Sequence, residues 1–542
     1  MEEALDLGKS SATGTFNLFI GYALSNVIMA VGLIIVARLL SPAEYGLYVV
    51  AIIPSTIINL FQDWGVSTAM TRYTAALRAE GKDYETGDVV VAGMMFEVAT
   101  GAALSLLSFF MAEFFASVLG RPASSTLISI VSITIFSGGL LGAAQAILVG
   151  FEKMALNGFT MVCQAVLKTA LAPLLILLGY GVLGAVWGYT LGFVGAGSIA
   201  VALVYFVLYR PVSKSRVSRR GVFQNLRPLL KYGVPLNISA IITGALTQTY
   251  AFMMALYASN SMIGNYQIAI SFAVLLGFFS TPISTVLLPV FSKLNPSNDH
   301  KLLKTVFTSS VKYTAILLTP ATMAVMALST SIVDTLFGGK YADAPLLLAL
   351  YVITNLYAMV GNISIGSFLS GLGETKMIMN LSILTLLVGL PLAFILIPPL
   401  GVLGVIIGTV LCGVPSLMWG LHWIWKRYEA KPEYKPSAKI FTASAIAATP
   451  SFLVTILLHT AAWIQLVIGL AVFLLIYIAV APAIGAVSQS DIRTLRTMFS
   501  GLGIISKIIN LPLGAAERVT RINKSKKLEK TQQAQEDSPE QN

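Results

Sequence analysis

Long apolar runs recur from one end of the chain to the other, with short polar segments between them. Many reach the roughly 20 residues that an α-helix needs to cross a bilayer, whereas a membrane barrel would show short alternating segments. The pattern predicts an all-α integral membrane protein with about 14 transmembrane helices, at approximately residues 16–39, 46–70, 89–117, 125–149, 157–178, 182–209, 233–257, 263–290, 305–336, 345–370, 377–397, 401–425, 437–459 and 462–487.

Composition agrees with this pattern. The chain is 56% hydrophobic and 11% charged, with a mean hydropathy of +0.81, whereas roughly a quarter of the residues in soluble domains are charged. Cys163 and Cys412 lie inside apolar runs, without a metal or redox spacing, so we expect no disulfide. The acidic N-terminus has no cleavage site before the first apolar run, which argues against a removable signal peptide.

The positive charge follows the predicted topology. With a cytoplasmic N-terminus, 30 of the 35 Lys and Arg residues fall in inner segments, and only Arg38, Arg121 and Lys340 fall in outer ones. Cytoplasmic loops carry this excess in membrane proteins. The distribution predicts a multi-pass protein of the cytoplasmic (plasma) membrane with both termini in the cytoplasm. The net charge of +11 therefore gives no support for nucleic acid as a partner.

An internal repeat divides the chain. Four matches occur in order at offsets of 218 to 223 residues: Gly46 and Tyr48 with Gly264 and Tyr266, Gly120 with Gly338, Lys153-Met154 with Lys376-Met377, and the Gly181 helix start with that at Gly401. The repeat predicts two pseudo-symmetric six-helix lobes, with a substrate path between them. The alternative is that short glycine-rich matches are common helix-packing signals.

The repeat and the charge pattern together predict five parts. They are an N-lobe at 1–210, a basic cytoplasmic linker at 211–232, a C-lobe at 233–428, two further spans at 429–488, and an amphipathic helix followed by a disordered tail at 489–542. We expect the linker to lie on the anionic inner leaflet and the amphipathic helix to lie at the membrane interface.

Several motifs together resemble those of a known family. They are Arg-Leu-Leu-Ser-Pro-x-Glu-Tyr-Gly at 38–46, Asp63-x-Gly, Thr71-Arg72-Tyr73, Gly150-Phe-Glu-Lys153 and the Gly-Val-Leu-Gly-x-x-x-Gly start at 181. They resemble the polysaccharide-export family of lipid-linked oligosaccharide flippases, whose superfamily also contains multidrug exporters and the peptidoglycan-precursor flippase. The resemblance implies two lobes that form a V.

The resemblance also implies a function. A polyprenyl-(pyro)phosphate-linked glycan would move to the outer leaflet by alternating access. The implied partners are this lipid-linked glycan, membrane lipids, and glycosyltransferases or a polymerase of the same pathway. Two rivals stay open: an ion-coupled multidrug antiporter of the same superfamily, and a non-transporting scaffold of a glycan-assembly complex.

Two lysines within spans are candidate cations for the lipid phosphate in a cleft, because a lysine at that depth is costly and suggests function. Lys168 lies close to mid-depth, and its alternative is a buried pair with Glu97. Lys312 lies about two turns into its span, and its alternative is to snorkel to the inner interface.

The other charged candidates are for gating or ion coupling, and they are Asp63, Arg38, Glu44, Arg72 and Glu97. Asp63 is an acid inside an apolar run, and its alternative is a fixed structural bond, such as a helix cap or a pair with Arg72. Arg38 and Glu44 flank the first outer turn, where a turn-fixing or gate contact is expected. Glu97 lies mid-helix, and it is either paired or neutral.

The sequence shows no catalytic constellation. A Gly-x-x-x-x-Gly-Lys-Ser/Thr phosphate loop, a cluster with metal-ligand spacing and a Ser/His/Asp order are all missing from it. We therefore expect a protein that is not an enzyme and has no cofactor or metal.

Overall fold

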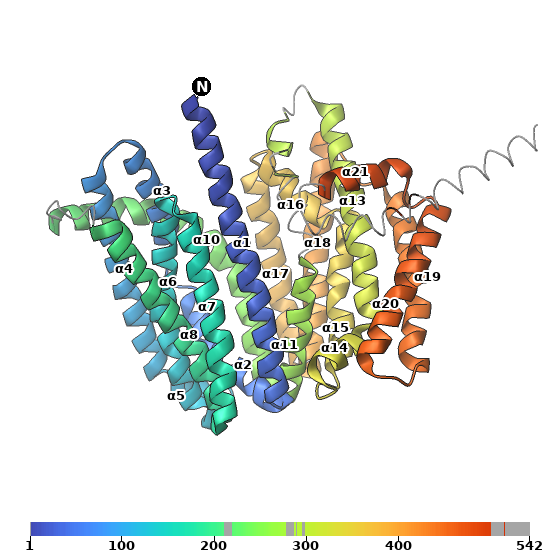
Figure 1. The fold of residues 1–542 in the computed structure, drawn as a ribbon, viewed down its shortest axis with the longest axis horizontal. Helices are drawn as coiled ribbons and strands as arrows, with labels where there is room; N and C mark the ends of the chain where they lie inside the picture. Colours follow the sequence, from blue (N-terminus) through green and yellow to red (C-terminus); the bar gives the residue numbers. More distant parts are fainter. Residues whose placement is uncertain are drawn as a thin grey trace, which may run out of the picture. The chain divides into compact units, whose positions relative to one another are not determined.

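The computed structural model describes residues 2–210, 219–277, 287–288, 290–294, 299–499, 514 and 517. In these residues the regular structure is helical and no strand occurs (Figure 1), which confirms the predicted all-α class. Ten helices of the described part are long and apolar enough to cross a membrane, or eleven if one bent pair, Ala344–Val360 with Asn362–Gly371, forms a single span.

The predicted number of spans is compatible with these helices. Helices α7 (Met154–Leu175) and α8 (Gly181–Leu203) lie in one of the ten apolar stretches, so that stretch contains two predicted spans. The predicted span 46–70 corresponds to two helices with a break between them. The predicted span 263–290 begins in α11 (Asn260–Leu275) and continues outside the described residues. The count of 14 therefore stays a prediction.

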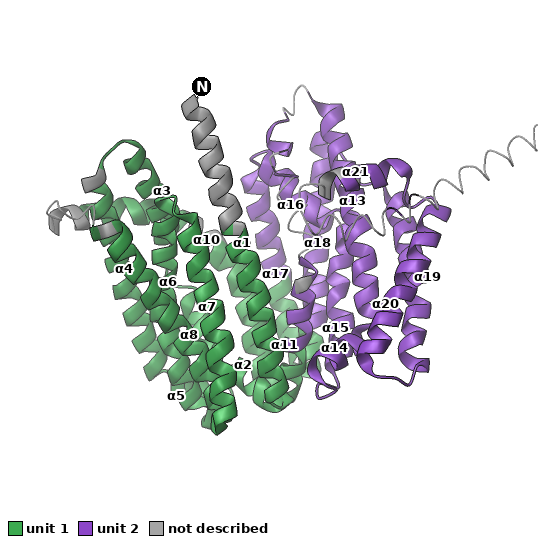
Figure 2. Ribbon diagram, viewed as in Figure 1, with its two compact units in different colours: residues 1–267, 389–405 green, residues 268–388, 406–542 purple. Residues whose placement is uncertain are grey.

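The chain divides into two compact units, coloured separately in Figure 2. Unit 1 contains residues 1–267 and 389–405, and unit 2 contains residues 268–388 and 406–542. The division does not follow the repeat, because α10 (Arg219–Tyr257), in the second half of the sequence, belongs to unit 1. The predicted lobe boundaries stay a prediction. Residues 211–218 of the predicted linker and 523–542 of the predicted tail lie outside the described residues.

Unit 1 is a bundle whose helices follow the predicted spans. Its other helices are α1 (Glu2–Leu39), α2 (Pro42–Asn59), α3 (Val66–Ala79), α4 (Asp83–Phe110), α5 (Ala112–Val118), η1 (Pro122–Ser124), α6 (Ser125–Gly150), η2 (Ile176–Tyr180) and η3 (Val204–Tyr209). Helix α7 packs against α1 and α8, α6 packs against α4 and α8, and α10 runs along α2, α3 and α4. Small residues permit these close crossings: a Cβ atom at Gly188 of α8 would overlap Ala172 of α7.

Two glycines related by the repeat contact each other's helix. Ser41 caps α2 through its side chain, and Ser259 accepts a hydrogen bond from the Met262 backbone N–H at 3.3 Å in the same way before α11. A Cβ atom at Gly46 would overlap the carbonyl oxygen of Asn260, and one at Gly264 would overlap the carbonyl oxygen of Pro42. Residues 42 and 260 are related by the same offset of 218 as residues 46 and 264. The contact is therefore reciprocal, which supports the predicted repeat.

Unit 2 contains most of the remaining helices. They are α13 (His300–Ala327), α14 (Ser329–Phe337), α15 (Ala344–Tyr351), η4 (Val352–Val360), α16 (Asn362–Gly371), α17 (Thr375–Leu400), α18 (Val402–Tyr428), α19 (Tyr434–Leu457), α20 (Ala462–Ala483) and α21 (Gln489–Phe499), although the end of α17 and the start of α18 belong to unit 1. Phe368 packs edge-to-face with Phe291 and Phe307 in the core. Helix α19 packs against α13 and α20.

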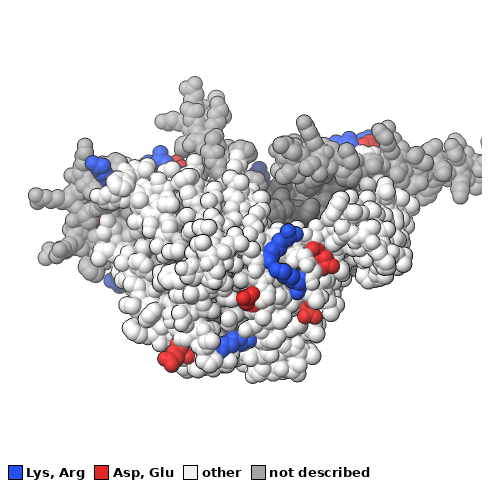
Figure 3. Space-filling model, turned by 60° about the horizontal axis from the view of Figure 1, so that its bottom comes forward, with Lys and Arg blue, Asp and Glu red and all other residues white. Residues whose placement is uncertain are grey.

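The surface agrees with a lipid environment. On the face drawn in Figure 3, charged side chains form a few small groups separated by broad uncharged areas. Large apolar side chains are exposed on the long helices, including Leu475 of α20 at 70% and Leu457 of α19 at 72%. Many exposed large apolar side chains on long helices are typical of contact with a membrane.

Candidate functional site

Lys168 of α7 lies against two aromatic rings of α8. Its Nζ is 3.8 Å from the centre of the Phe193 ring and 4.4 Å from the centre of the Tyr189 ring. Residues four positions apart share a face of a helix, so Tyr189 and Phe193 form one surface. A Cβ atom at Gly192 would overlap the side-chain stem of Lys168, so this glycine makes room for the lysine. The rings stabilise the ammonium through cation–π attraction.

Among the described residues, no carboxylate pairs with this cation. In the described residues Lys168 forms no ion pair, and Glu97, its predicted alternative partner, contacts other side chains. The aromatic surface continues to α2, since the Tyr189 and Tyr48 ring centres are 6.1 Å apart and those of Tyr48 and Tyr45 are 5.9 Å apart. Lys168 is thus a partly buried cation whose contacts are hydrophobic and aromatic, a state in which it can accept an anion.

Asp63 lies in the break between α2 and α3. Trp64 has φ of 49° and Gly65 has φ of 75°, so the chain leaves the helical conformation here. The Asp63 Oδ1 atom accepts a hydrogen bond of 2.8 Å from the Ser67 backbone N–H, which places an acid at the N-terminus of α3, where the helix dipole favours it. A Cβ atom at Gly65 would overlap the backbone of Gly233, so the break fits closely against α10.

Glu97 of α4 lies beside this break. It is 1% exposed, and its Oε2 atom accepts a hydrogen bond of 3.3 Å from Gln62 Nε2. The side chains of Asp63 and Ser67 also contact the Glu97 carboxyl group. A Cβ atom at Gly139 of α6 would overlap Gln62, so this glycine provides the space for the group. Asp63 and Glu97, which were separate candidates in the sequence, therefore form one carboxyl pair, in which Glu97 is buried and Asp63 is half-buried.

Two consecutive glycines of α6 connect the carboxyl pair to the lysine. Gly138 faces the Phe193 ring, which would lie 3.6 Å from a Cβ atom there, and Gly139 faces Gln62 and Glu97. The lysine–aromatic cluster and the carboxyl pair therefore lie on neighbouring sides of one helix. We call Lys168, Tyr189, Phe193, Asp63 and Glu97 together the candidate site.

The other predicted gating residues lie elsewhere. Glu44 completes a capping box at the start of α2, where its Oε2 accepts hydrogen bonds of 2.8 Å from the Ser41 backbone N–H and hydroxyl, a contact that fixes the turn. Arg72 does not bind Asp63 in the described structure; its guanidinium lies over the Tyr232 ring of α10 at 4.3 Å. Arg38 lies in the last turn of α1. Gating roles for Arg38, Glu44 and Arg72 stay predictions.

Arg121 is a residue that sequence reasoning did not select. It lies between α5 and η1, and its Nε and Nη2 atoms donate hydrogen bonds to Asn260 Oδ1 at 2.6 Å and to the Ala258 carbonyl at 2.7 Å. Nη1 donates to the carbonyls of Leu119, at 2.8 Å, and Ala255. Burial lowers the pKa of the guanidinium below its usual range. Arg121 thus joins the α5–α6 connection to the end of α10 and the start of α11.

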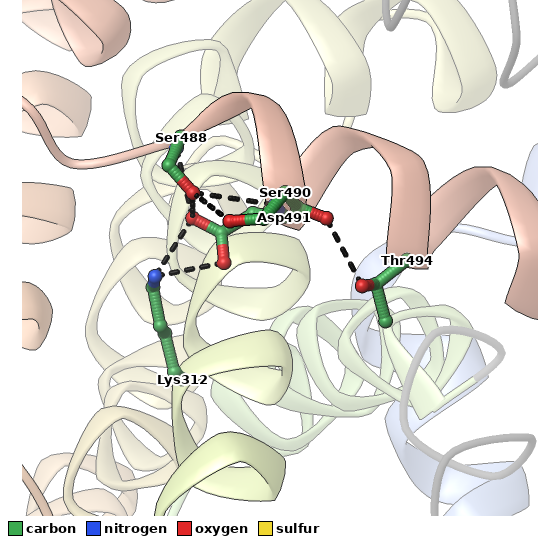
Figure 4. Close-up of polar contacts among 5 residues, drawn as sticks. All are labelled: Lys312, Ser488, Ser490, Asp491 and Thr494. Carbon is green, nitrogen blue, oxygen red and sulfur yellow. Dashed lines mark hydrogen bonds and ion pairs between the residues drawn. The ribbon is translucent and has the colours of Figure 1, made fainter.

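Lys312 forms an ion pair (Figure 4). Its Nζ lies 2.8 and 2.7 Å from the two carboxylate oxygens of Asp491 in α21. Asp491 also accepts a hydrogen bond of 2.8 Å from the Ser488 backbone N–H, and the following residue, Ile492, is fully buried beside Ile316. The pair anchors α21, the helix predicted to be amphipathic, to α13. The contact of Lys312 with a substrate phosphate stays a prediction.

Replacing Lys312 with methionine should loosen α21. The variant leaves the Asp491 carboxylate, which is 4% exposed, without its cation, and we expect a loss of about 1–3 kcal/mol, below the value for a fully buried pair because Lys312 is partly exposed. Thermal unfolding of the purified protein in detergent measures the loss, and tryptic cleavage at Arg493 reports release of the helix. Lys304→Met, at an exposed position of the same helix, is the control. Equal effects of both substitutions would contradict the anchoring role.

Within the described residues no three His, Cys, Asp or Glu side chains gather in a group that could hold a metal ion. The carboxyl pair can bind a proton or a single small cation, and the lysine can bind an anion.

Comparison with known proteins places this geometry in context. Residues 35–345 match the family model described as polysaccharide biosynthesis protein. The chain is 22% identical over 310 residues to the probable low-salt glycan biosynthesis flippase Agl15 of Haloferax volcanii, a match that covers 56% of this chain and 66%, slightly less than two thirds, of that protein. It is 24% identical over 399 residues to the lipopolysaccharide biosynthesis protein WzxC of Escherichia coli K12, covering 71% of this chain and 75% of that one.

A solved structure shares the fold. The lipid II flippase MurJ in its inward closed conformation superposes with a TM-score of 0.66 at 18% identity, and the match covers 85% of this chain and 97% of that one. At this identity the likeness concerns the fold alone. It supports a membrane architecture of many helices and gives no information about the role of any single residue.

Proposed function

Because this chain belongs to the polysaccharide biosynthesis protein family, we propose that it is a flippase for a polyprenyl-(pyro)phosphate-linked oligosaccharide. In this proposal it moves the headgroup from the inner to the outer leaflet of the cytoplasmic membrane, for the assembly of a surface polysaccharide or glycan. It acts as a transporter and not as an enzyme. The relative named as a flippase supports this activity, and the apolar exposed surface of the long helices supports the location.

The surroundings of Lys168 give the proposal its strongest support. Its ammonium lies within a span, against two aromatic rings and without a carboxylate in the described residues. A cation in hydrocarbon is costly unless something compensates its charge, and the rings compensate only part of that cost. A phosphate or pyrophosphate that enters beside the rings would complete the pair through charge-assisted hydrogen bonds. An anionic headgroup therefore fits this site.

The substrate has two chemically different parts, which explains what the protein must provide. The polyprenyl tail is apolar and can stay in the bilayer, whereas the phosphate and the sugar hydroxyls lose their hydrogen bonds to water in hydrocarbon. We propose that the headgroup crosses by alternating access between the two repeat-related halves while the tail stays in lipid. Both termini would lie in the cytoplasm, and glycosyltransferases or a polymerase of the same pathway would be its functional partners.

A second candidate is an ion-coupled antiporter of cationic drugs. The Asp63–Glu97 pair favours it, because buried carboxyl groups can bind a cation or a proton. Lys168 opposes it, because its positive charge, in the aromatic cluster on the neighbouring side of α6, repels a cationic substrate.

The test is deletion of the gene in its host, followed by analysis of lipid-linked glycans on each face of the membrane. A flippase predicts accumulation of the lipid-linked glycan on the inner leaflet and its return to normal when the wild-type gene is supplied. Normal glycan with raised sensitivity to cationic drugs would instead identify the antiporter. A scaffold predicts loss of glycan assembly without transport of the lipid-linked glycan by the purified protein in proteoliposomes.

A further inference from the structure

Two acceptor groups face each other inside the helix bundle of unit 1. The Asp63 carboxyl, in the α2–α3 break, contacts the Glu97 carboxyl of α4. Glu97 is 1% exposed, and its Oε2 atom is satisfied by Gln62. In the described residues its Oε1 atom is buried and finds no donor in hydrogen-bond geometry. A buried carboxylate oxygen without a donor, in a group that contacts a second carboxyl group, indicates that a proton or a cation belongs at this position.

In the part of the chain that the structure describes, no side-chain cation fills this role. The charged group that acts on Glu97 in the described structure is Asp63. On α3, Arg72 lies over the Tyr232 ring, and Arg78 donates a hydrogen bond of 3.0 Å to the carbonyl of Phe151. Residues 125–150 of α6 contain no charged residue. The other charged residues of the packed helices are Glu44 on α2, Asp83, Glu85 and Asp88 on α4, and Arg219, Arg220, Arg227 and Lys231 on α10. Lys231 lies two residues before Gly233, but it is exposed and forms no ion pair in the described residues.

We infer that Asp63 and Glu97 form a proton-binding site, in which one carboxyl group donates a hydrogen bond to the other. With one shared proton the pair carries a single negative charge and gives Glu97 Oε1 its missing partner. Without the proton, the buried Glu97 carboxylate and the half-buried Asp63 carboxylate repel each other at short range. The only covalent change is the gain or loss of one O–H bond, and the proton is exchanged with water.

Release of the proton acts on the helix break. Asp63 belongs to the non-helical segment whose Gly65 packs directly against Gly233 of α10, so repulsion between the carboxylates pushes on the contact between α3 and α10. Gly138 of α6 faces the Phe193 ring beside Lys168, and the next residue, Gly139, faces Glu97 of the pair. The proton site is thus placed to couple protonation to binding of the anionic headgroup. This coupling, but not the proton site itself, rests on the proposed function.

The proton site is tested without any substrate. Infrared difference spectra of the purified full-length protein in lipid nanodiscs are recorded as the pH is changed. The wild-type protein should show the carbonyl band of a buried protonated carboxylic acid. The band should be lost in Glu97→Gln and in Asp63→Asn, which preserve side-chain size, and kept in Glu113→Gln, which removes an exposed acid of α5. A wild-type spectrum without the band, or a band that sodium ions displace at constant pH, would overturn the inference.

The coupling is tested in proteoliposomes with a lipid-linked glycan. In the wild type and Glu113→Gln, transport should change several-fold when a pH difference is imposed across the membrane, and in Glu97→Gln it should not respond. A Glu97→Gln protein with a wild-type response would refute coupling through this pair. If no variant and no wild-type protein transports the glycan, the flippase proposal fails, while the infrared result still decides whether the pair binds a proton.

Discussion

Lys168→Met should abolish most glycan export. Methionine keeps the length and apolar contacts of the stem beside Gly192 but removes the ammonium that we propose binds the lipid phosphate. A hydrogen bond between charged groups contributes about 1.5–3 kcal/mol, so headgroup transport should fall about 10- to 100-fold. The measurement is transport of lipid-linked glycan by the purified protein in proteoliposomes, with thermal unfolding as the check on folding.

Two further substitutions sharpen this result. Lys168→Arg keeps the positive charge and should retain part of the activity, while Phe193→Leu removes the closer ring and leaves the charge in place. If the ammonium binds phosphate, Lys168→Arg should transport better than Lys168→Met. Equal, near-normal transport by all three variants would show that the cation only fills space between α7 and α8.

Arg121→Gln should separate the α5–α6 connection from the α10–α11 corner. The guanidinium donates to Asn260 and to the Ala255 and Ala258 carbonyls. The shorter glutamine amide has too few N–H donors to form all of these hydrogen bonds. Loss of one charged hydrogen bond costs about 1.5–3 kcal/mol, so the arrangement in which Arg121 joins the two segments should lose at least tenfold in population relative to arrangements in which they are apart. Pulsed electron paramagnetic resonance measures the distance between spin labels introduced at Ser117 and Tyr257, after Cys163 and Cys412 have been replaced by serine.

The charge-matched control is Lys340→Gln, which removes another of the three predicted outer cations without touching this corner's hydrogen bonds. Its distance distribution between Ser117 and Tyr257 should be that of the wild type. A distribution for Arg121→Gln that equals the control would show that the α10–α11 corner stays in place without the arginine.

Helix positions were predictable from the sequence because they depend on the length of apolar runs. The predicted span 157–178 corresponds to α7, Met154–Leu175, and the span 437–459 to α19, Tyr434–Leu457. The hydrophobic length needed to cross a bilayer is a local property. The relation between Gly46 and Gly264 was also detectable, because close backbone contacts tolerate no side chain and leave glycine at corresponding positions.

The partners of the charged residues were not predictable, because they depend on which helix faces meet. Lys168 was expected to have Glu97 as its alternative partner, but Tyr189 and Phe193 of the next helix surround it. Their spacing of four was a signal in the sequence, although many aromatic pairs share it. Arg121 offered no local signal at all, since its partners on α10 and α11 lie 134 to 139 residues away.

The reciprocal contact of Gly46 and Gly264 suggests how the chain originated. Gly46 lies against the carbonyl oxygen of Asn260, four residues before Gly264. Gly264 lies against the carbonyl oxygen of Pro42, four residues before Gly46. Contacts in which equivalent residues exchange partners occur at the axis of an isologous homodimer. The corner between α2 and α11 fits an origin of the predicted repeat in two copies of a six-span ancestor, which dimerised here before gene duplication and fusion joined them. Substitutions on the two sides of this corner should consequently be constrained as a pair over evolutionary time.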